Sequence, residues 1–299
     1  MSRLATVLER TKQRQPRVAF IGQADGLMEG AAEQLKSRGL GHAALIGPGG
    51  IAPESDPRLG SVSQILRARW PERVRDGIHA LDLAVNPLLF ATGLVALGEF
   101  DVCMSGTAVP VDSIEEAARW VIGEDRARKG RGSLTYVSAS DERLLLFAAP
   151  DAAGPLDAKG LAQLALTAAI HRKRASGEES NVAFLVASPT QDASHADAEL
   201  ALAELRAMAP ALSASVEWDW STSADGPGRP RFRSRPNVLI FPDPITAHLA
   251  QLVLRDAAGL PTWGPMYPGD TWVLAGIVDG AIEDIVTVAA LAGAGLTGL

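Results

Sequence analysis

The chain has 299 residues and a formal net charge of −7, because 35 aspartates and glutamates outnumber 28 lysines and arginines. Hydrophobic residues make up 47% and charged residues 21%, which excludes a chain disordered throughout its length. The negative charge argues against a general binder of nucleic acid or of anionic membranes. Cys103 is the single cysteine, so an intramolecular disulfide is excluded, and residues 1–17 contain no apolar leader. We therefore expect a cytoplasmic protein.

Short β-rich runs alternate with helical patterns, which predicts an α/β fold with right-handed crossovers and a largely parallel sheet. A turn at residues 140–142 separates two β-rich runs and predicts a hairpin, so some pairing should be antiparallel. Ser113, with Glu116 three residues later, has the spacing of a helix N-cap. In chain order we expect strand 17–22, helix 26–38, strand 42–47, helix 86–98, strand 100–105, helix 113–122, strands 133–138 and 143–148, helix 158–173, strand 181–187, helix 196–208, strand 237–241, helix 245–256, strand 271–278 and a helix from Ala281.

Motifs for phosphate and metal binding are weak in this sequence. Residues 22–26 lie between a predicted strand and a predicted helix, as a dinucleotide-binding loop does, but the third glycine is missing. No nucleophile elbow and no P-loop occurs. The five histidines are scattered, with no two at ligand spacing on one helix, so we expect no metal site.

Residues 221–236 differ in composition from the rest of the chain. They are rich in glycine and proline and carry Arg229, Arg231, Arg233 and Arg235 at every second position. Prolines disfavour a helix here and favour an extended course, in which alternate side chains point the same way. The segment is either a solvated loop or an anion-binding flap, which would hold the phosphates of coenzyme A or a dinucleotide, or contact an acidic surface of a dimer partner.

Two groups of motifs resemble the phosphate acetyltransferase/butyryltransferase family, the phosphotransacetylases. Residues 86–90 (NPLLF), 97–101 (LGEFD) and 104–106 (MSG) are similar to one run of family motifs. Residues 237–243 (NVLIFPD), 264–265 (GP) and 283–286 (EDIV) are similar to a second run. Their order and spacing fit from about Arg17 to the end of the chain.

The resemblance implies two α/β domains in an isocitrate/isopropylmalate dehydrogenase-like architecture, with mostly parallel sheets and a cleft between the domains. Residues 1–122 plus 269–299 would form the first domain, and residues 123–268 the second, through which a homodimer forms. The resemblance also implies acyl transfer between coenzyme A and phosphate without a metal or an acyl-enzyme. Arginines clamp the phosphoryl group in that reaction, and a Ser/Asp pair assists the thiol.

The positions at which the resemblance implies arginines carry other residues in this chain. Counted without gaps, these positions are Glu116, one of residues 277–279 and one of residues 82–84. The implied serine falls on Ile277. Only Asp284 matches the implied catalytic set, and it also suits the N-terminal acid of the last helix. Because bidentate guanidinium groups hold phosphoryl dianions, we expect a divergent member in which the family's own reaction is inefficient.

Three hypotheses of function remain open at this point. The first is a divergent phosphate acyltransferase in which Arg119, Arg143 or the 229–235 arginines bind the anion, with coenzyme A as a substrate. The second is an NAD(P)-dependent dehydrogenase that acts on a pterin/folate-like or other small substrate, by analogy of fold alone. The third is a non-catalytic, ligand-binding member of the family.

The candidate site residues mostly follow predicted strand ends, where open α/β sheets place their ligands. We expect a small-molecule substrate and a homodimer, with neither nucleic acid nor a membrane as partner. The candidate catalytic residues are Asp284 and Ser105. The candidates for binding substrate or cofactor are Thr107, Asp243, Thr246, His248, Asp279, Arg229 and Arg231.

Overall fold

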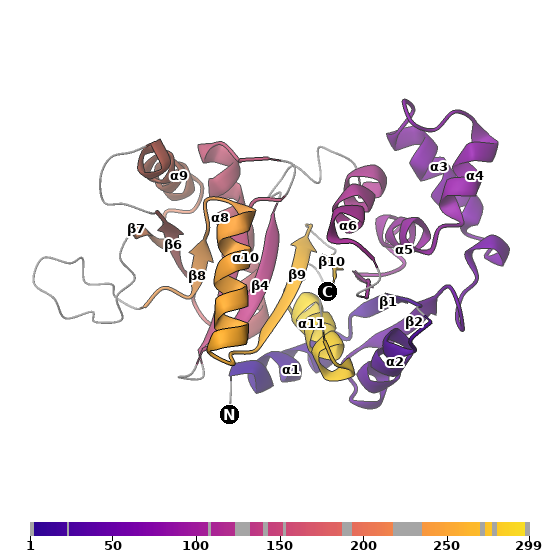
Figure 1. The fold of residues 1–299 in the computed structure, drawn as a ribbon, viewed down its shortest axis with the longest axis horizontal. Helices are drawn as coiled ribbons and strands as arrows, with labels where there is room; N and C mark the ends of the chain where they lie inside the picture. Colours follow the sequence, from indigo (N-terminus) through magenta and orange to yellow (C-terminus); the bar gives the residue numbers. More distant parts are fainter. Residues whose placement is uncertain are drawn as a thin grey trace, which may run out of the picture. The chain divides into compact units, whose positions relative to one another are not determined.

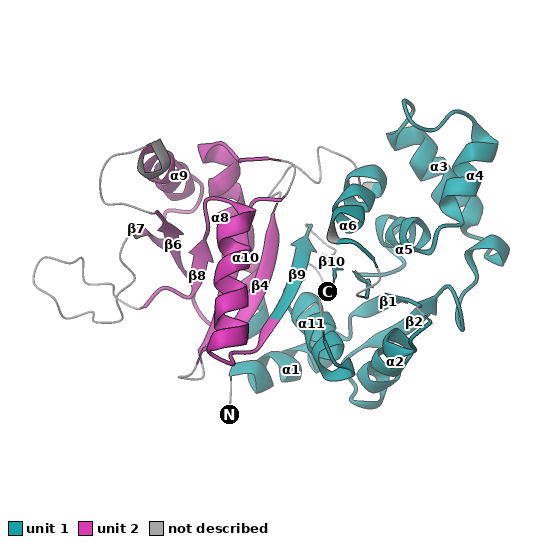
Figure 2. Ribbon diagram, viewed as in Figure 1, with its two compact units in different colours: residues 1–128, 174–176, 263–299 teal, residues 129–173, 177–262 magenta. Residues whose placement is uncertain are grey.

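The computed structural model divides the chain into two compact units, coloured separately in Figure 2. The first unit comprises residues 1–128, 174–176 and 263–299, and the second comprises residues 129–173 and 177–262. The domain boundaries expected from the sequence, after residues 122 and 268, stay a prediction. The structure describes residues 3–22, 24–106, 109–122, 132–139, 143–151, 154–186, 193–217, 235–269, 273–276 and 280–296.

The first unit is built on five strands in the order β2-β1-β3-β10-β9. The first four are parallel to their neighbours, whereas β9 runs antiparallel to β10. β1 is an apolar run that is buried from its second residue on, as is typical of an inner strand of a parallel sheet. The strands are β1 (Arg17–Ile21), β2 (His42–Ile46), β3 (Val102–Met104), β9 (Thr262–Pro268) and β10 (Val273–Ala275).

Helices cover both faces of this sheet, with α2 and α11 on the side opposite α5 and α6 (Figure 1). Ala19 and Ile21 point to the core beneath α3, α5 and α6. On the other side, the hydroxyl of Thr11 in α1 donates to the carbonyl of Ala290 in α11 (3.0 Å). The elements are α1 (Arg3–Arg14), α2 (Leu27–Ser37), the short turn η1 (Pro53–Ser55), α3 (Leu59–Arg69), α4 (Gly77–Ala84), α5 (Pro87–Ala96), α6 (Val111–Ala117), the π-helical η2 (Ala118–Ile122) and α11 (Ile282–Ala294).

Among the described residues, no single helix is long and apolar enough to cross a membrane. Within the same residues, α4 and α5 taken together pass that test by length and composition, but a 100° bend separates them.

The second unit has five strands in the order β4-β5-β8-β6-β7. β4 and β5 form the predicted antiparallel hairpin, and the remaining pairs are parallel. One face packs against α10 through Ala247, whereas on the other face the Tyr136 hydroxyl lies 3.0 Å from Nδ1 of His171 in α8. The elements are β4 (Ser133–Ser138), β5 (Leu144–Ala149), α8 (Ala158–Ser176), β6 (Asn181–Leu185), α9 (Ala193–Met208), β7 (Ser213–Glu217), β8 (Val238–Ile240), α10 (Pro244–Leu252) and the π-helical η3 (Val253–Ala257). The last three residues of α8, 174–176, belong to the first unit.

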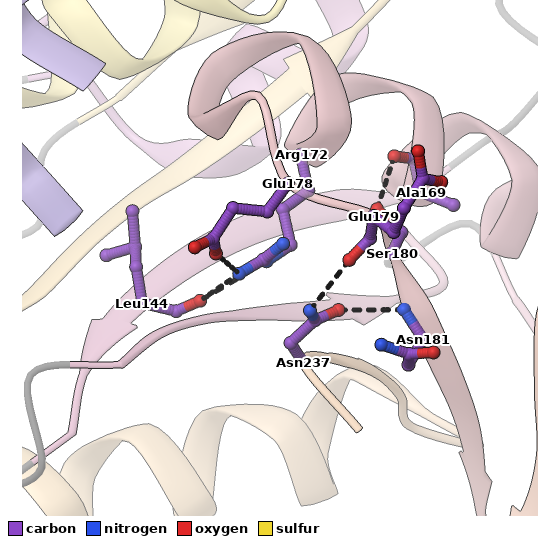
Figure 3. Close-up of polar contacts among 8 residues, drawn as sticks. All are labelled: Leu144, Ala169, Arg172, Glu178, Glu179, Ser180, Asn181 and Asn237. Atoms are coloured by element: carbon purple, nitrogen blue, oxygen red, sulfur yellow. Dashed lines mark hydrogen bonds and ion pairs between the residues drawn. The ribbon is translucent and has the colours of Figure 1, made fainter. Parts of the chain in front are cut away.

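Polar side chains join α8 to the amino ends of the second unit's strands (Figure 3). Asn237, the first residue of the NVLIFPD motif, accepts from the amide of Asn181 (2.9 Å) and donates to the carbonyl of Glu179 (3.1 Å). Arg172 is 2% exposed and donates to the first carbonyl of β5 (3.2 Å) and to the carboxylate of Glu178 (2.9 Å). This motif asparagine therefore holds strands together.

The predicted α/β, mostly parallel fold is confirmed, with one cap wrong and several elements not predicted. α6 begins at Val111, so Ser113 lies inside its first turn and is not the N-cap. Pro110 takes that position instead, with φ −57° and ψ 141°, because its ring fixes a φ from which a helix can start. The helices α1, α3 and α4 and the strands β7 and β9 were not predicted.

Candidate functional site

The carboxyl edge of the first unit's sheet is the candidate site. The parallel strands β1, β2, β3 and β10 all end at this edge, and each is followed within two residues by a glycine. A Cβ on Gly276 would lie 2.7 Å from Ile114 Cδ1 and 3.5 Å from Ser105 Oγ, so the chain segments approach closely here. Ligands of open α/β sheets bind beyond the carboxyl ends of the strands, so we expect a ligand of this chain at this edge.

Ser105 follows β3 directly and is 1% exposed. Its backbone amide donates to the carbonyl of Ala275 at the end of β10 (2.9 Å), and its hydroxyl donates to the same oxygen (3.3 Å). The described geometry thus gives Ser105 a structural task, because it ties the ends of two central strands together. A catalytic role for Ser105 stays a prediction.

Asp284 lies in the first turn of α11 and is half-buried. Its Oδ2 accepts from the backbone amide of Ala281, and its Oδ1 accepts from the indole nitrogen of Trp263, both at 3.2 Å. An acid in the first turn also interacts favourably with the helix dipole. Asp284 therefore caps α11, and the indole of Trp263 orients its carboxylate at the edge of the sheet.

Trp263 was not predicted as a site residue. It is 7% exposed and precedes the Gly264-Pro265 motif. A buried indole nitrogen needs an acceptor, because it can only donate, so a tryptophan within a motif is a signal of a nearby carboxylate or carbonyl. Sequence alone could not say which acceptor that is, since 21 residues separate Trp263 from Asp284.

The helices α2, α5 and α11 begin at this edge, and their first turns pack against each other or against the strand ends. A Cβ on Gly30 in α2 would lie 2.7 Å from Ile282 Cδ1 in α11, and Gly47 after β2 approaches Pro87, the first residue of α5. Asn86 caps α5 by accepting from the second and third amides of that helix. Because unpaired amides and the helix dipole make helix N-termini favourable for anions, this edge suits a negatively charged ligand.

The resemblance implies arginines at three positions. The positions among these that the structure describes carry no guanidinium group. Glu116 on α6 pairs with Arg73 (3.0 Å), and that guanidinium lies 5.1 Å and 5.3 Å from the ring centres of Trp70 and Trp120. Residues 82–84 form the end of α4. Residues 277–279 lie outside the described part of the chain.

Three predicted binding residues lie on α10 or at its start in the second unit. Asp243 caps the helix by accepting from the amide of Thr246 (2.8 Å) and from its hydroxyl (2.6 Å). Burial alone would raise the pKa of the Asp243 carboxyl, but these hydrogen bonds outweigh it and hold the pKa below its usual value. His248 is exposed further along the helix. The structure thus brings Asp243 and Thr246 together as a cap.

Four predicted binding residues, Thr107, Asp279, Arg229 and Arg231, lie outside the described residues and stay predictions. Within the described part, no group of three or more His, Cys, Asp or Glu side chains is placed to hold a metal ion.

Burial raises the pKa of the Cys103 thiol to about 12, and a hydrogen bond with Thr92 offsets only part of that effect. This thiol is therefore not a nucleophile at neutral pH.

Comparison with known proteins gives consistent matches. The family described as phosphate acetyl/butaryl transferase matches residues 2–293. A phosphate acetyltransferase of Paracoccus denitrificans is 28% identical over 262 residues, which cover 80% of this chain and 81% of that protein. The EutD phosphotransacetylase of Staphylococcus aureus (19% identical, TM-score 0.79, 97% of this chain and 98% of that chain) has the same fold. So does a phosphotransacetylase of Streptococcus pyogenes (17% identical, TM-score 0.82, 98% and 97%).

Proposed function

The chain belongs to the phosphate acetyl/butaryl transferase family, and from this premise we propose that it transfers an acyl group between coenzyme A and phosphate or a related acyl acceptor. The family match over residues 2–293 carries the proposal. The position of Asp284 at the carboxyl edge of the first sheet supports it, because ligands of open α/β sheets bind there. Coenzyme A enters as a substrate, and the proposal includes no further cofactor.

In the proposed reaction, Asp284 accepts the proton of the coenzyme A thiol. The thiolate sulfur then attacks the acyl carbon of an acyl phosphate, a carbon–sulfur bond forms, and the bond from that carbon to the phosphate oxygen breaks. Phosphate leaves with the proton, which Asp284 gives up to its oxygen. The reverse reaction returns the proton to sulfur. General-base assistance of this kind contributes about 10²–10⁴-fold to a rate. The indole of Trp263 fixes one carboxylate oxygen, so the group need not be ordered during each turnover.

The other site candidates enter the proposal with the roles expected from the sequence. Ser105 is proposed as the second catalytic residue, held at the edge by its bonds to β10, whereas Thr107, Asp279, Arg229 and Arg231 are proposed contacts to substrate. Asp243, Thr246 and His248 keep their proposed binding role, with the first two combined in one helix cap.

We expect the rate with phosphate as acceptor to lie well below about 10 per second, the median for enzymes. An anion bound without one of its charged partners loses roughly 2–5 kcal/mol, and the implied arginines are missing at Glu116 and at residues 82–84 and 277–279. An acceptor with less negative charge would suffer less from these replacements.

The experiment is a panel of acyl-CoA and acceptor pairs, with release of free thiol as the readout. Transfer from acetyl-CoA or butyryl-CoA to phosphate or to a less charged acceptor supports the proposal. A chain that transfers no acyl group at high enzyme concentration contradicts it. In that case thermal unfolding with coenzyme A, NAD(P) and folates discriminates the dehydrogenase and the non-catalytic alternatives, because a ligand that binds only the folded chain raises its stability.

The homodimer and the cytoplasmic location belong to the same proposal. The outer face of α10 and η3 carries Ile245, Leu249 and Val253, which are 70%, 56% and 62% exposed and recur every four residues. A large exposed apolar patch favours a protein interface, and a two-fold pair of identical helices covers such a stripe with itself. Light scattering should give twice the chain mass of 31.3 kDa, and a mass of one chain would contradict the dimer. The lone thiol of Cys103 fits the reducing cytoplasm.

A further inference from the structure

Three arginines converge at the amino edge of the first unit's sheet, opposite to the candidate site. Arg10 and Arg14 lie on α1, which ends three residues before β1 begins, and Arg174 lies near the end of α8 in a segment that belongs to the first unit. Nε of Arg10 donates to the carbonyl of Arg174 (3.0 Å), and the guanidinium of Arg14 donates to the carbonyl of Leu296, just after α11 (2.6 Å). All three arginines are half-buried.

The positive charge of this arginine cluster, Arg10, Arg14 and Arg174, is not balanced by acids of the described part of the chain. Among the described residues no carboxylate pairs with any of the three, and Nη1 of Arg174 is buried without a hydrogen-bond partner. Unlike Arg174, the two residues before it have acidic partners. Arg172 pairs with Glu178, and Lys173 pairs with Glu179, at 2.9 Å and 2.7 Å.

The surroundings confirm the imbalance. Burial, followed by the charges of Arg10 and Arg174, lowers the pKa of Arg14 below its usual value. Glu9 on the same helix pairs with Lys12, and the acids of α11 lie in its first turn, at the other end from Leu296. The carbonyls at the helix ends carry only partial negative charge, about half an elementary charge per helix, so they offset the three guanidinium groups in part.

We propose that the arginine cluster binds a phosphoryl oxyanion. A guanidinium group is a planar fork that pairs with two oxygens, and forks from two helices suit a tetrahedral group with at least three free oxygens better than a planar carboxylate. The buried Nη1 of Arg174 would gain its missing acceptor, and the repulsion among the three charges would be relieved. The site lies at the edge opposite to Asp284 and does not depend on the proposed acyl transfer.

Calorimetric titration with inorganic phosphate, at an ionic strength held constant with chloride, tests the proposal. The variants are Arg174→Gln and Arg10→Gln, and Lys173→Gln is the matched control because it removes a neighbouring charge that already has a partner. Wild type and the control should show one binding event that each arginine variant weakens about tenfold or more, since a charge-assisted hydrogen bond is lost. Methyl phosphate in a parallel titration distinguishes an ester from the free ion.

Phosphate affinity is compared between chains that all keep the same carboxyl edge. Phosphate that also binds at that edge therefore contributes equally to every titration. If acyl transfer fails, wild type still shows this event and the arginine variants lose it. Thermal unfolding without phosphate provides a second readout, in which Arg174→Gln should be at least as stable as Lys173→Gln because like charges are removed. Equal phosphate affinity in all four chains, or an Arg174→Gln chain that is less stable than the control in the absence of phosphate, would overturn the proposal.

Discussion

The amino edge of the second unit's sheet and the carboxyl edge of the first unit's sheet both carry polar side chains, but they use them differently. At the amino edge, Arg172 is 2% exposed and Asn237 engages both ends of its amide with backbone groups (Figure 3). At the carboxyl edge, Asp284 is half-buried, and the Trp263 indole and the Ala281 amide occupy two of the roughly four acceptor positions of its carboxylate.

Asn237 and Asp284 both belong to motifs of the same family resemblance, so the motif alone does not separate a structural residue from a reactive one. Burial and the remaining hydrogen-bonding capacity separate them. A buried side chain whose groups are bonded to the backbone holds the fold, whereas a partly exposed carboxylate with free lone pairs can also accept a proton from a ligand.

The largest effect on stability is expected from Arg172→Met, which keeps most of the side-chain length and removes the charge. The variant leaves Glu178 and the first carbonyl of β5 without this donor, and breaking a buried pair from one side costs about 3 kcal/mol or more. Urea unfolding should show this loss, while Lys173→Met, on an exposed ion pair, should lose no more than about 1 kcal/mol. Equal losses in the two variants would contradict a structural amino edge.

A smaller effect is expected from Asp243→Ala, which removes the cap of α10 and should cost about 1 kcal/mol. The folded pKa of Asp243 is lowered, so its contribution is fully present above the ordinary pKa of 3.8 and disappears as the pH falls through the folded value. Unfolding free energies of wild type and variant should therefore converge in acid. A gap that stays constant down to the lowest pH would show that the carboxylate charge is not involved.

The smallest effect concerns Cys103, which lies in β3 one strand position from the edge and is 2% exposed. Because its pKa is raised to about 12, the folded chain should not react with a thiol reagent at pH 8, and the unfolded chain should react fully. Rapid reaction of the folded chain would mean that β3 opens to solvent, and it would weaken the account of a rigid carboxyl edge.

Much of the fold could be predicted, because its central strands are short apolar runs bounded by glycine and its hairpin has a polar turn. β1 and β2 end within one residue of the prediction, and β4 pairs with β5 as expected. β9 was not predicted since Gly264 and Pro265 are poor strand formers and their pairing with β10 is a matter of tertiary structure. α1 buries only Val7 and Thr11, so its apolar pattern is too sparse to read.

The candidate site was predictable only in part. Asp284 follows from the EDIV motif, but its partner Trp263 lies on another element, and a single sequence contains no information on that contact. The arginine cluster shows the same limit, because Arg10 and Arg174 are 164 residues apart and look like ordinary surface residues of their helices. What makes them unusual is that no described carboxylate pairs with them, which only the folded structure shows.

The central claim, that Asp284 serves acyl transfer at the carboxyl edge, is tested most directly by the initial rate of acyl phosphate formation from acyl-CoA and phosphate in Asp284→Asn. Glu283→Gln is the control, since it removes the adjacent first-turn acid, which pairs with Arg38. The account predicts that kcat falls about 100-fold or more in Asp284→Asn with the fold retained, and that Glu283→Gln stays within about twofold of wild type. Equal rates in wild type and Asp284→Asn would contradict it.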